Sequence, residues 1–121
     1  MRHYIYMNSP VGMLTLGEEN GYITHVLFGK RQLEGYFLEN DLLSMAKSQL
    51  NEYFDGMRKS FALPLMPEGT DFQKSVWRAL TDIDYGTTAT YGQIAEKIGS
   101  PKAARAVGMA NNKNPISIVV P

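Results

Sequence analysis

The 121-residue chain is 44% hydrophobic, so it can bury one core or form two small fused lobes. Its formal net charge is zero, which excludes a polybasic protein held to nucleic acid by the electrostatic field of its total charge. It contains no cysteine and only two histidines, which excludes disulfides and thiol nucleophiles and predicts neither a zinc site nor another cofactor. No apolar run approaches the roughly 20 residues of a transmembrane helix and no signal-peptide pattern is present, so we expect a cytoplasmic protein without membrane contact.

The first third of the chain predicts three strands, over residues 4–8, 13–17 and 22–28. Turn-forming residues separate them, and the pair Asn20-Gly21 is a strong signal for a tight hairpin. The strands therefore predict a small antiparallel sheet.

A helix follows the predicted sheet. Apolar residues recur at helical spacing between Asn40 and Asp55, with Asn40 as the cap and Gly56 as the stop. A connector with prolines and a glycine comes next, over residues 62–69. We interpret it as the boundary between an N-terminal lobe, residues 1–66, and a second lobe, residues 67–121.

The second lobe predicts three helices. Thr70 and Gln73 have the spacing of a capping box, and the helix that they begin has an apolar stripe that reaches Ile83. A second box at Thr90-Tyr91-Gly92-Gln93 begins a short helix that Gly99 should end. Ser100-Pro101 then predicts the start of a third helix that runs through Ala110.

Two helices joined by a tight glycine turn are the pattern of a helix-turn-helix. The predicted fold class is α+β: a small antiparallel three-stranded sheet with a helix, followed by a helical lobe with a helix-turn-helix. That lobe is winged-helix-like and has an incomplete final strand.

One stretch of the second lobe is basic although the chain as a whole is neutral. Residues 97–113 contain no acidic side chain and four cations, Lys97, Lys102, Arg105 and Lys113. Small residues at positions 103, 104, 106 and 108 make the third helix thin enough to approach a groove closely. Lys102 and Lys113 could then reach phosphates while Arg105 enters the base stack.

The residues alone leave these functional interpretations open. The alanines can instead pack the helix against its own core while the cations form a solvated face, and short helix pairs often have no DNA function. Likewise Tyr91, at the helix start beside Thr90, can push a phosphate during base flipping or merely cover a core edge. Trp77 and the N-terminal aromatic residues are typical of a core, and His25 is typical of a structural histidine.

An ordered set of segments resembles the methylated-DNA protein-cysteine methyltransferases, also called alkylguanine-DNA alkyltransferases. The segments are Thr70-Asp71-Phe72-Gln73-Lys74-Ser75-Val76-Trp77, Thr90-Tyr91-Gly92-Gln93-Ile94-Ala95, Pro101-Lys102-Ala103-Ala104-Arg105-Ala106-Val107-Gly108, and Asn114-Pro115 through Pro121. The resemblance covers nearly all of residues 67–121, and the N-terminal lobe is similar to the family's variable lobe more loosely.

The resemblance implies a DNA repair protein whose helix-turn-helix enters the minor groove and flips an alkylated guanine out of the duplex. It implies that Arg105 fills the place of the flipped base and that Tyr91 rotates the phosphate. Ala103 and Ala104 match positions that lie against the groove, and Asn114 matches an asparagine that braces the turn before the active-site strand. Together with Thr90 and Lys102 these residues form the predicted DNA-binding site.

The sequence departs from the family at the nucleophile. In the family, the proline equivalent to Pro121 is followed directly by Cys-His-Arg, and the cysteine accepts the alkyl group. This sequence ends at Pro121, and Ser117, the only nearby hydroxyl, is a poor substitute for a thiolate. We therefore predict a truncated member with no catalytic residue and no methyl transfer.

The end of the sequence also predicts a partner. Ile116, Ile118, Val119 and Val120 make a strand-like apolar run, which we expect to be an exposed edge that pairs with a second copy in a homodimer. The leading hypothesis is thus a lesion-binding protein that contacts duplex DNA with alkylated guanine. The alternatives are a fragment of an active methyltransferase and a structural or protein-interaction module without DNA function.

Overall fold

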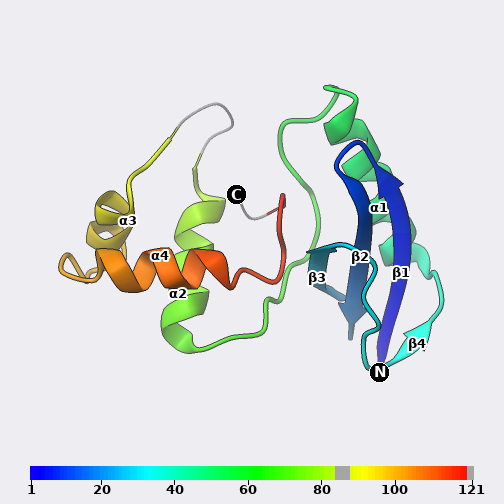
Figure 1. Cartoon of the computed structure of the whole chain (residues 1–121), viewed down its shortest axis with the longest axis horizontal. Helices are drawn as coiled ribbons and strands as arrows, with labels where there is room; N and C mark the ends of the chain where they lie inside the picture. The colour runs from blue at the N-terminus through cyan, green and yellow to red at the C-terminus, as the bar shows by residue number, and fades with distance from the viewer. Residues whose placement is uncertain (84–87, 120–121) are drawn as a thin grey trace. The chain divides into compact units, whose positions relative to one another are not determined.

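The computed structural model describes residues 1–83 and 88–119. These residues form two compact units (Figure 1). One consists of Met1–Pro67 together with Pro115–Val119 and is called the sheet unit below; the other, Glu68–Asn114, is called the helical unit. The predicted division into lobes 1–66 and 67–121 stays a prediction, and no sequence pattern indicated that residues 115–119 return to the sheet unit.

The sheet unit confirms the three predicted strands and adds a fourth. Strands β1 (Arg2–Ser9), β2 (Gly12–Glu19) and β3 (Tyr22–Phe28) are joined by antiparallel hairpins. Asn20 and Gly21 have φ values of 53° and 83° at the second turn, as a two-residue primed turn requires.

The predicted three-stranded antiparallel sheet needs one correction. The short strand β4 (Tyr36–Phe37) pairs in parallel with β1, which gives a four-stranded mixed sheet in the order β3-β2-β1-β4. A strand of two residues has no period-two pattern, so the hydrophobic periodicity gave no sign of it.

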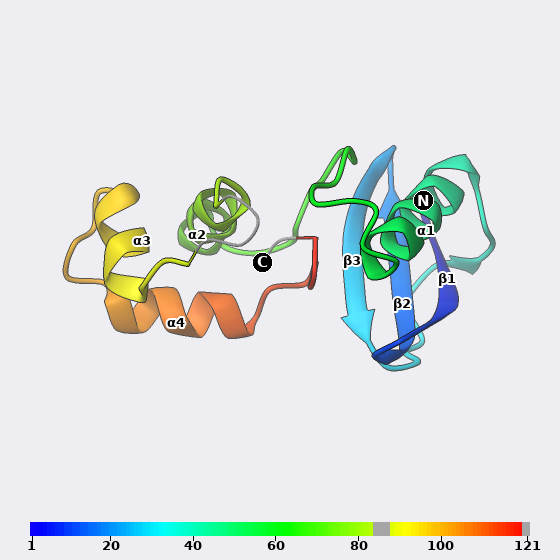
Figure 2. The same cartoon turned by 90° about the horizontal axis from the view of Figure 1, so that it is seen from above.

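Helix α1 (Asp41–Phe54) packs across one face of β1, β2 and β3 (Figure 2). Asn40 caps it, since its side chain accepts a hydrogen bond from Leu43 N, and the helix stops before Gly56, whose φ is 76°. Leu43 and Leu50 of α1 and Leu16 of β2 are fully buried in the core of this unit.

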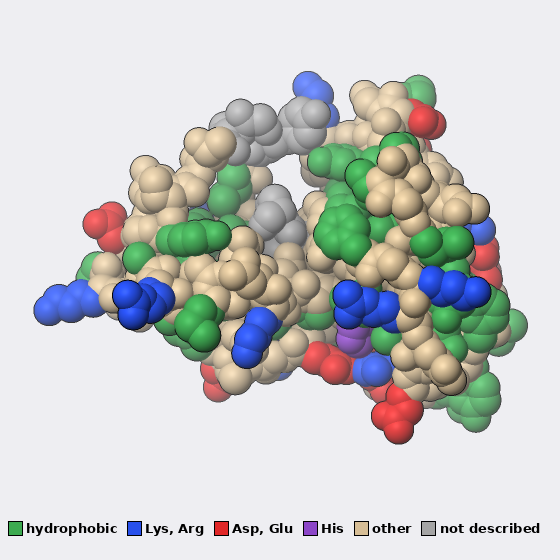
Figure 3. Space-filling view, in the orientation of Figure 1, with side chains coloured by type: hydrophobic (Ala, Val, Ile, Leu, Met, Phe, Trp, Pro, Cys, Tyr) green, Lys and Arg blue, Asp and Glu red, His purple; other side chains and the backbone are tan. Residues whose placement is uncertain are grey.

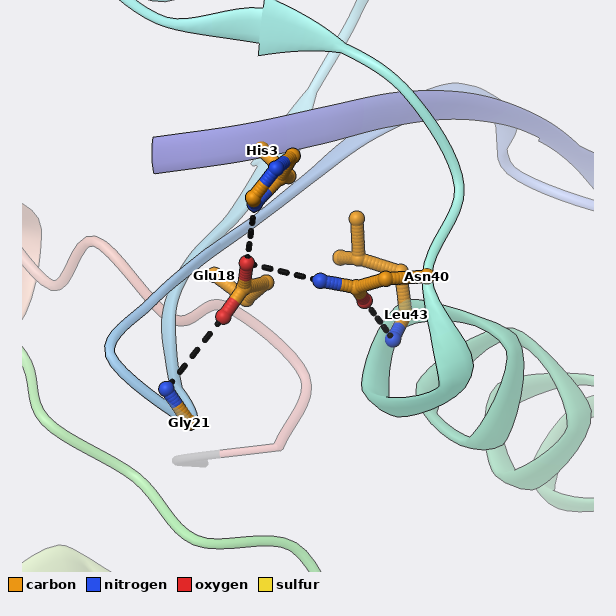
Figure 4. A network of polar contacts seen from close by, with 5 residues as sticks. All are labelled: His3, Glu18, Gly21, Asn40 and Leu43. Atoms are coloured by element: carbon orange, nitrogen blue, oxygen red, sulfur yellow. Dashed lines mark hydrogen bonds and ion pairs between the residues drawn. The ribbon is translucent and has the colours of Figure 1, made fainter. Parts of the chain in front are cut away.

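A polar network joins the sheet to the start of α1 (Figure 4). The Glu18 side chain is 5% exposed, and its Oε1 lies 2.6 Å from His3 Nδ1 and 2.7 Å from the Asn40 Nδ2 donor. Its Oε2 accepts a 3.4 Å hydrogen bond from Gly21 N in the β2–β3 turn. Because the same Asn40 caps α1, one buried carboxylate connects β1, β2, a turn and a helix start.

The helical unit contains α2 (Asp71–Thr81), α3 (Tyr91–Lys97) and α4 (Ala104–Asn112). Both predicted capping boxes are present, Thr70 with Gln73 and Thr90 with Gln93. Trp77 is 1% exposed and its indole Nε1 donates a 2.9 Å hydrogen bond to Ala110 O, which ties α2 to α4. Helix α2 ends at Thr81, two residues before the predicted limit of its apolar stripe at Ile83, and residues 84–87 lie outside the described part.

The predicted start of the third helix at Ser100-Pro101 is wrong. Gly99 has a φ of 81° and Ser100 N donates to Ala95 O at 2.9 Å, so Ser100 completes a C-terminal capping motif for α3. The next residues form a turn closed by a hydrogen bond from Ala103 N to Ser100 O, and α4 begins at Ala104. Helix α4 therefore starts three residues after Pro101, at a cap residue, Ala103, that makes no side-chain hydrogen bond.

The predicted exposed strand edge at the end of the chain is also wrong. Val26 N of β3 donates to Pro115 O at 2.8 Å, and Ser117 N donates to Val26 O at 3.0 Å. Ile116 is fully buried there and makes a single parallel bridge to Val26, after which residues 117–119 form a turn. The reason to expect a homodimer through this edge is therefore lost; Val120 lies outside the described residues.

Candidate nucleic-acid interface

Helices α3 and α4 form the predicted helix pair, and both contact α2. Thr90 is placed by its cap, because its Oγ1 accepts from Gln93 N at 3.0 Å while Gln93 Oε1 accepts from Thr90 N at 2.8 Å. This reciprocal pair fixes the backbone where Tyr91 begins α3. The cap therefore sets where the Tyr91 side chain leaves the helix.

One face of α4 and its flanking turns is exposed and basic. Lys102, Arg105 and Lys113 are exposed, and none of them pairs with an acidic side chain of the described residues. Figure 3 shows Lys and Arg side chains spaced along α4. Met109 is 58% exposed on the same face, one turn after Arg105.

The fourth predicted cation, Lys97, differs from the other three. Its Nζ lies 3.5 Å from Asp82 Oδ2, in an exposed ion pair between α3 and the end of α2. An exposed pair of this kind contributes little to stability, but it offsets part of the Lys97 charge. The uncompensated basic face is thus confined to Lys102, Arg105 and Lys113.

Some of the small residues of α4 are buried in the helical unit, and others are exposed. Val107 and Ala110 are buried and hold the helix to its own unit, whereas Ala106 is exposed on the outer face. Ala103 and Ala104 are half-buried at the start of the helix, where Ala103 makes no side-chain cap. Packing against its own unit therefore describes the buried side of the helix, and contact of Ala106 with a groove stays a prediction.

Tyr91 is 47% exposed and lies against α4. A Cβ added to Gly108 would lie 2.9 Å from Tyr91 Cε2, and Asn111 Nδ2 donates a 3.5 Å hydrogen bond to the phenolic oxygen. Neither contact was predicted: Asn111 was not among the predicted site residues, and Gly108 was expected only to keep the helix thin. A signal existed, because glycine inside a helix costs about 1 kcal/mol relative to alanine and is usually retained for close packing.

Asn114 follows the end of α4, where its backbone N donates to Asn111 O at 3.3 Å. It is half-buried and directly precedes Pro115, whose carbonyl is bound by β3. Its position is thus the point where the chain passes from the helical unit back to the sheet unit.

His25, which we expected to be structural, is half-buried on β3 with its Nδ1 2.9 Å from Thr24 Oγ1. Within residues 1–83 and 88–119 no group of three His, Asp or Glu side chains is arranged to hold a metal ion. None of the helices in these ranges is both long and apolar enough to cross a bilayer.

Two family models match the chain, one after the other. The first is described as "6-O-methylguanine DNA methyltransferase, ribonuclease-like domain" and covers residues 2–67. The second is described as "6-O-methylguanine DNA methyltransferase, DNA binding domain" and covers residues 71–121, which include α2, α3 and α4.

Similar proteins agree with these matches. The methylated-DNA–protein-cysteine methyltransferase of Methanosarcina acetivorans is 51% identical over 98% of this chain and 80% of its own length. A crystal structure of the Mycobacterium tuberculosis O6-methylguanine methyltransferase has a TM-score of 0.90 and 44% identity, covering all of this chain and 76% of that one. The Mycobacterium tuberculosis OGT in complex with DNA matches with a TM-score of 0.89 and 44% identity, over 98% of this chain and 74% of that one. The chain belongs to the 6-O-methylguanine DNA methyltransferase family of DNA repair proteins and carries its DNA-binding domain.

Proposed function

We propose that the chain binds duplex DNA containing alkylated guanine by placing the exposed face of α4 in the minor groove. The observation that carries the proposal is the set of three exposed cations, Lys102, Arg105 and Lys113, that lack an acidic partner among the described residues. Their number fits local phosphate contacts made by a neutral protein, and it implies modest, salt-sensitive affinity.

The shape of α4 supports entry into a narrow groove. The minor groove of B-DNA is about 6 Å wide, whereas a helix with its side chains is about 10 Å across. Only a face with small side chains can come close to the groove floor. Ala106 is exposed beside Arg105, and Ala103 and Ala104 are half-buried at the leading end of the helix.

In this proposal Arg105 occupies the space of the extruded guanine. Arg105 lies in the first turn of α4, and its planar guanidinium can stack where a base has left. Lys102 and Lys113 lie before and after it along the chain and contact phosphates on either side. Tyr91 meets the phosphate next to the lesion, and Asn114 braces the turn that leaves α4.

We further propose that these 121 residues bind the lesion without accepting its alkyl group. Methyl transfer in this family requires a cysteine thiolate, and the sequence contains no cysteine. No side-chain hydrogen bond that would activate the Ser117 hydroxyl is present among the described residues, so we do not expect it to replace the thiolate. A serine without a base is a weak nucleophile.

A gel-shift assay combined with intact-mass measurement tests both parts. The purified chain is mixed with a duplex that contains O6-methylguanine and, separately, with the same duplex containing guanine. We expect a shifted band that is stronger on the methylated duplex, together with an unchanged protein mass. A methyl-sized mass gain would contradict the non-catalytic part. No shift on either duplex at low salt would contradict DNA binding and favour a structural or protein-interaction module.

A further inference from the structure

Contacts between α3 and α4 hold the ring of Tyr91 in one place. Its edge lies so close to Gly108 that a Cβ there would be 2.9 Å from Cε2 and 3.1 Å from Cδ2. Real Cβ atoms essentially never approach another carbon that closely, so the ring occupies space that exists only because residue 108 is glycine. On the neighbouring turn, Asn111 Nδ2 reaches the phenolic oxygen at 3.5 Å.

This packing is not needed for the core of the helical unit. Tyr91 remains 47% exposed, whereas Trp77, Val76 and Val107 are almost completely buried and form the core of that unit. Glycine also weakens a helix interior, so Gly108 is unfavourable for α4 unless the close approach has another role. The contact therefore determines where an exposed side chain lies.

The ring lies next to the basic face. Gly108 follows Arg105 by three residues, and residues at that spacing are neighbours on a helix surface. Tyr91 thus borders the face through Gly108, while the cap of Thr90 fixes the backbone from which the ring extends. An aromatic group anchored at both its backbone and its ring loses little conformational freedom when it meets a ligand.

We propose that Gly108 and Asn111 are positioning residues that hold the Tyr91 ring beside Arg105 before DNA arrives. This inference rests on the proposed function, in which Tyr91 meets the phosphate next to the lesion. Gly108 supplies the space and Asn111 orients the hydroxyl. Because the hydrogen bond is long, the space at Gly108 contributes more than Asn111 does.

The test combines two single variants with a control. Gly108→Ala should displace the ring and weaken binding to the O6-methylguanine duplex by about tenfold, a loss that is common when an interface contact is removed. Asn111→Ala should weaken it by about two- to threefold, because the bond that it removes is at the outer limit of length. Gly92→Ala is the matched control: its new Cβ meets only Thr90 Oγ1 at 3.7 Å, an ordinary contact, so affinity should not change.

A double-mutant cycle separates positioning from a direct clash between the methyl group added at residue 108 and DNA. In a Tyr91→Ala background there is no ring to displace, so Gly108→Ala should have no further effect on affinity. Likewise, Asn111→Ala should have no effect in a Tyr91→Phe background, which lacks the hydroxyl. If Gly108→Ala costs the same tenfold with and without the Tyr91 ring, the positioning role is wrong and the glycine acts directly on the groove.

The position of the ring is also measurable without DNA. In aromatic NMR spectra of the free protein, Gly108→Ala should shift the Tyr91 ring resonances and remove their contacts to residue 108. The Trp77 indole N–H, bonded to Ala110 O, should stay unchanged and report an intact unit. Unchanged Tyr91 resonances in Gly108→Ala would overturn the inference even if DNA binding is confirmed. Absence of DNA binding by the unaltered protein would instead contradict the proposed function and leave the NMR result to decide the positioning.

Discussion

Glu18 in the sheet unit and Arg105 in the helical unit show two different uses of a charged side chain. Glu18 is buried and is surrounded by His3, Asn40 and the backbone of Gly21, whereas Arg105 is exposed and has no acidic partner among the described residues. A buried charge with partners supports the fold, because losing one partner leaves the others unsatisfied. An exposed charge without partners contributes little to folding and remains available to a ligand.

The largest expected effect on stability follows from removing the buried Glu18 side chain. Glu18→Ala leaves His3 and Asn40 without their acceptor and weakens the cap of α1, so we expect the free energy of unfolding to fall by about 3 kcal/mol. Chemical denaturation measures it. Glu19→Ala is the control: its ion pair with Arg2 is 3.4 Å long and its side chain is 36% exposed, so the loss should stay under about 1 kcal/mol. Equal losses in the two variants would show that the Glu18 network does not support the fold.

Arg105→Ala is the corresponding substitution of the exposed charge, and we expect it to change DNA binding more than stability. Stability should change by less than about 0.5 kcal/mol, because the side chain is exposed and has no acidic partner among the described residues. Preference for the methylated duplex over the unmodified one should fall by about 1–3 kcal/mol, measured by fluorescence anisotropy on both duplexes. Arg78→Ala, which removes an exposed arginine from α2, is the control and should keep the preference. Equal losses of affinity on damaged and undamaged DNA would contradict the role of Arg105 in place of the base.

Lys102→Ala distinguishes a side chain that recognises the damaged base from one that only contacts the DNA phosphates. It should weaken binding to both duplexes alike and reduce the slope of log affinity against log salt by about 0.9, the value for one phosphate contact. Lys47→Ala, in the sheet unit, should leave that slope unchanged. A selective loss on the methylated duplex would instead place Lys102 at the lesion.

Local rules predicted much of the fold, for reasons that are visible in particular residues. Asn40, Thr70 and Thr90 cap their helices through atoms within three residues, so their effect is contained in a short stretch of sequence. The turn at Asn20-Gly21 was equally local, because both residues accept positive φ.

The features that were missed depend on distant partners. Strand β4 exists because Tyr36 and Phe37 lie beside His3 and Tyr4, and Ile116 is buried because the edge of β3 accepts residues 115–117. Neither pairing has a local signal, since sheet register is set by contacts between segments far apart in sequence.

In the candidate site, too, local features were predicted from the sequence and features that depend on packing were not. The cations of α4 and the aromatic residue at the start of α3 were predicted, because charge runs and capping boxes are visible in the sequence. That Asp82 offsets the charge of Lys97, and that Gly108 and Asn111 contact Tyr91, depends on how α2, α3 and α4 pack. The residue types of the candidate interface were therefore visible in the sequence, whereas the contacts between them were not.

The smallest expected effect concerns an exposed charge that does have partners. Hydrogen bonds from Ser44 and Lys47, and the charge of Lys47, lower the pKa of Glu39 below its ordinary value. A carboxyl whose pKa is depressed in the folded state adds stability above its unfolded pKa and loses it as the pH falls through the folded pKa. Glu39→Gln should therefore be slightly less stable than the unaltered protein at neutral pH, and the difference should vanish in acid. Because Glu39 is at the surface, added salt should shrink the difference as well. A difference that persists in acid and in high salt would show that Glu39 acts through packing instead of charge, unlike either Glu18 or Arg105.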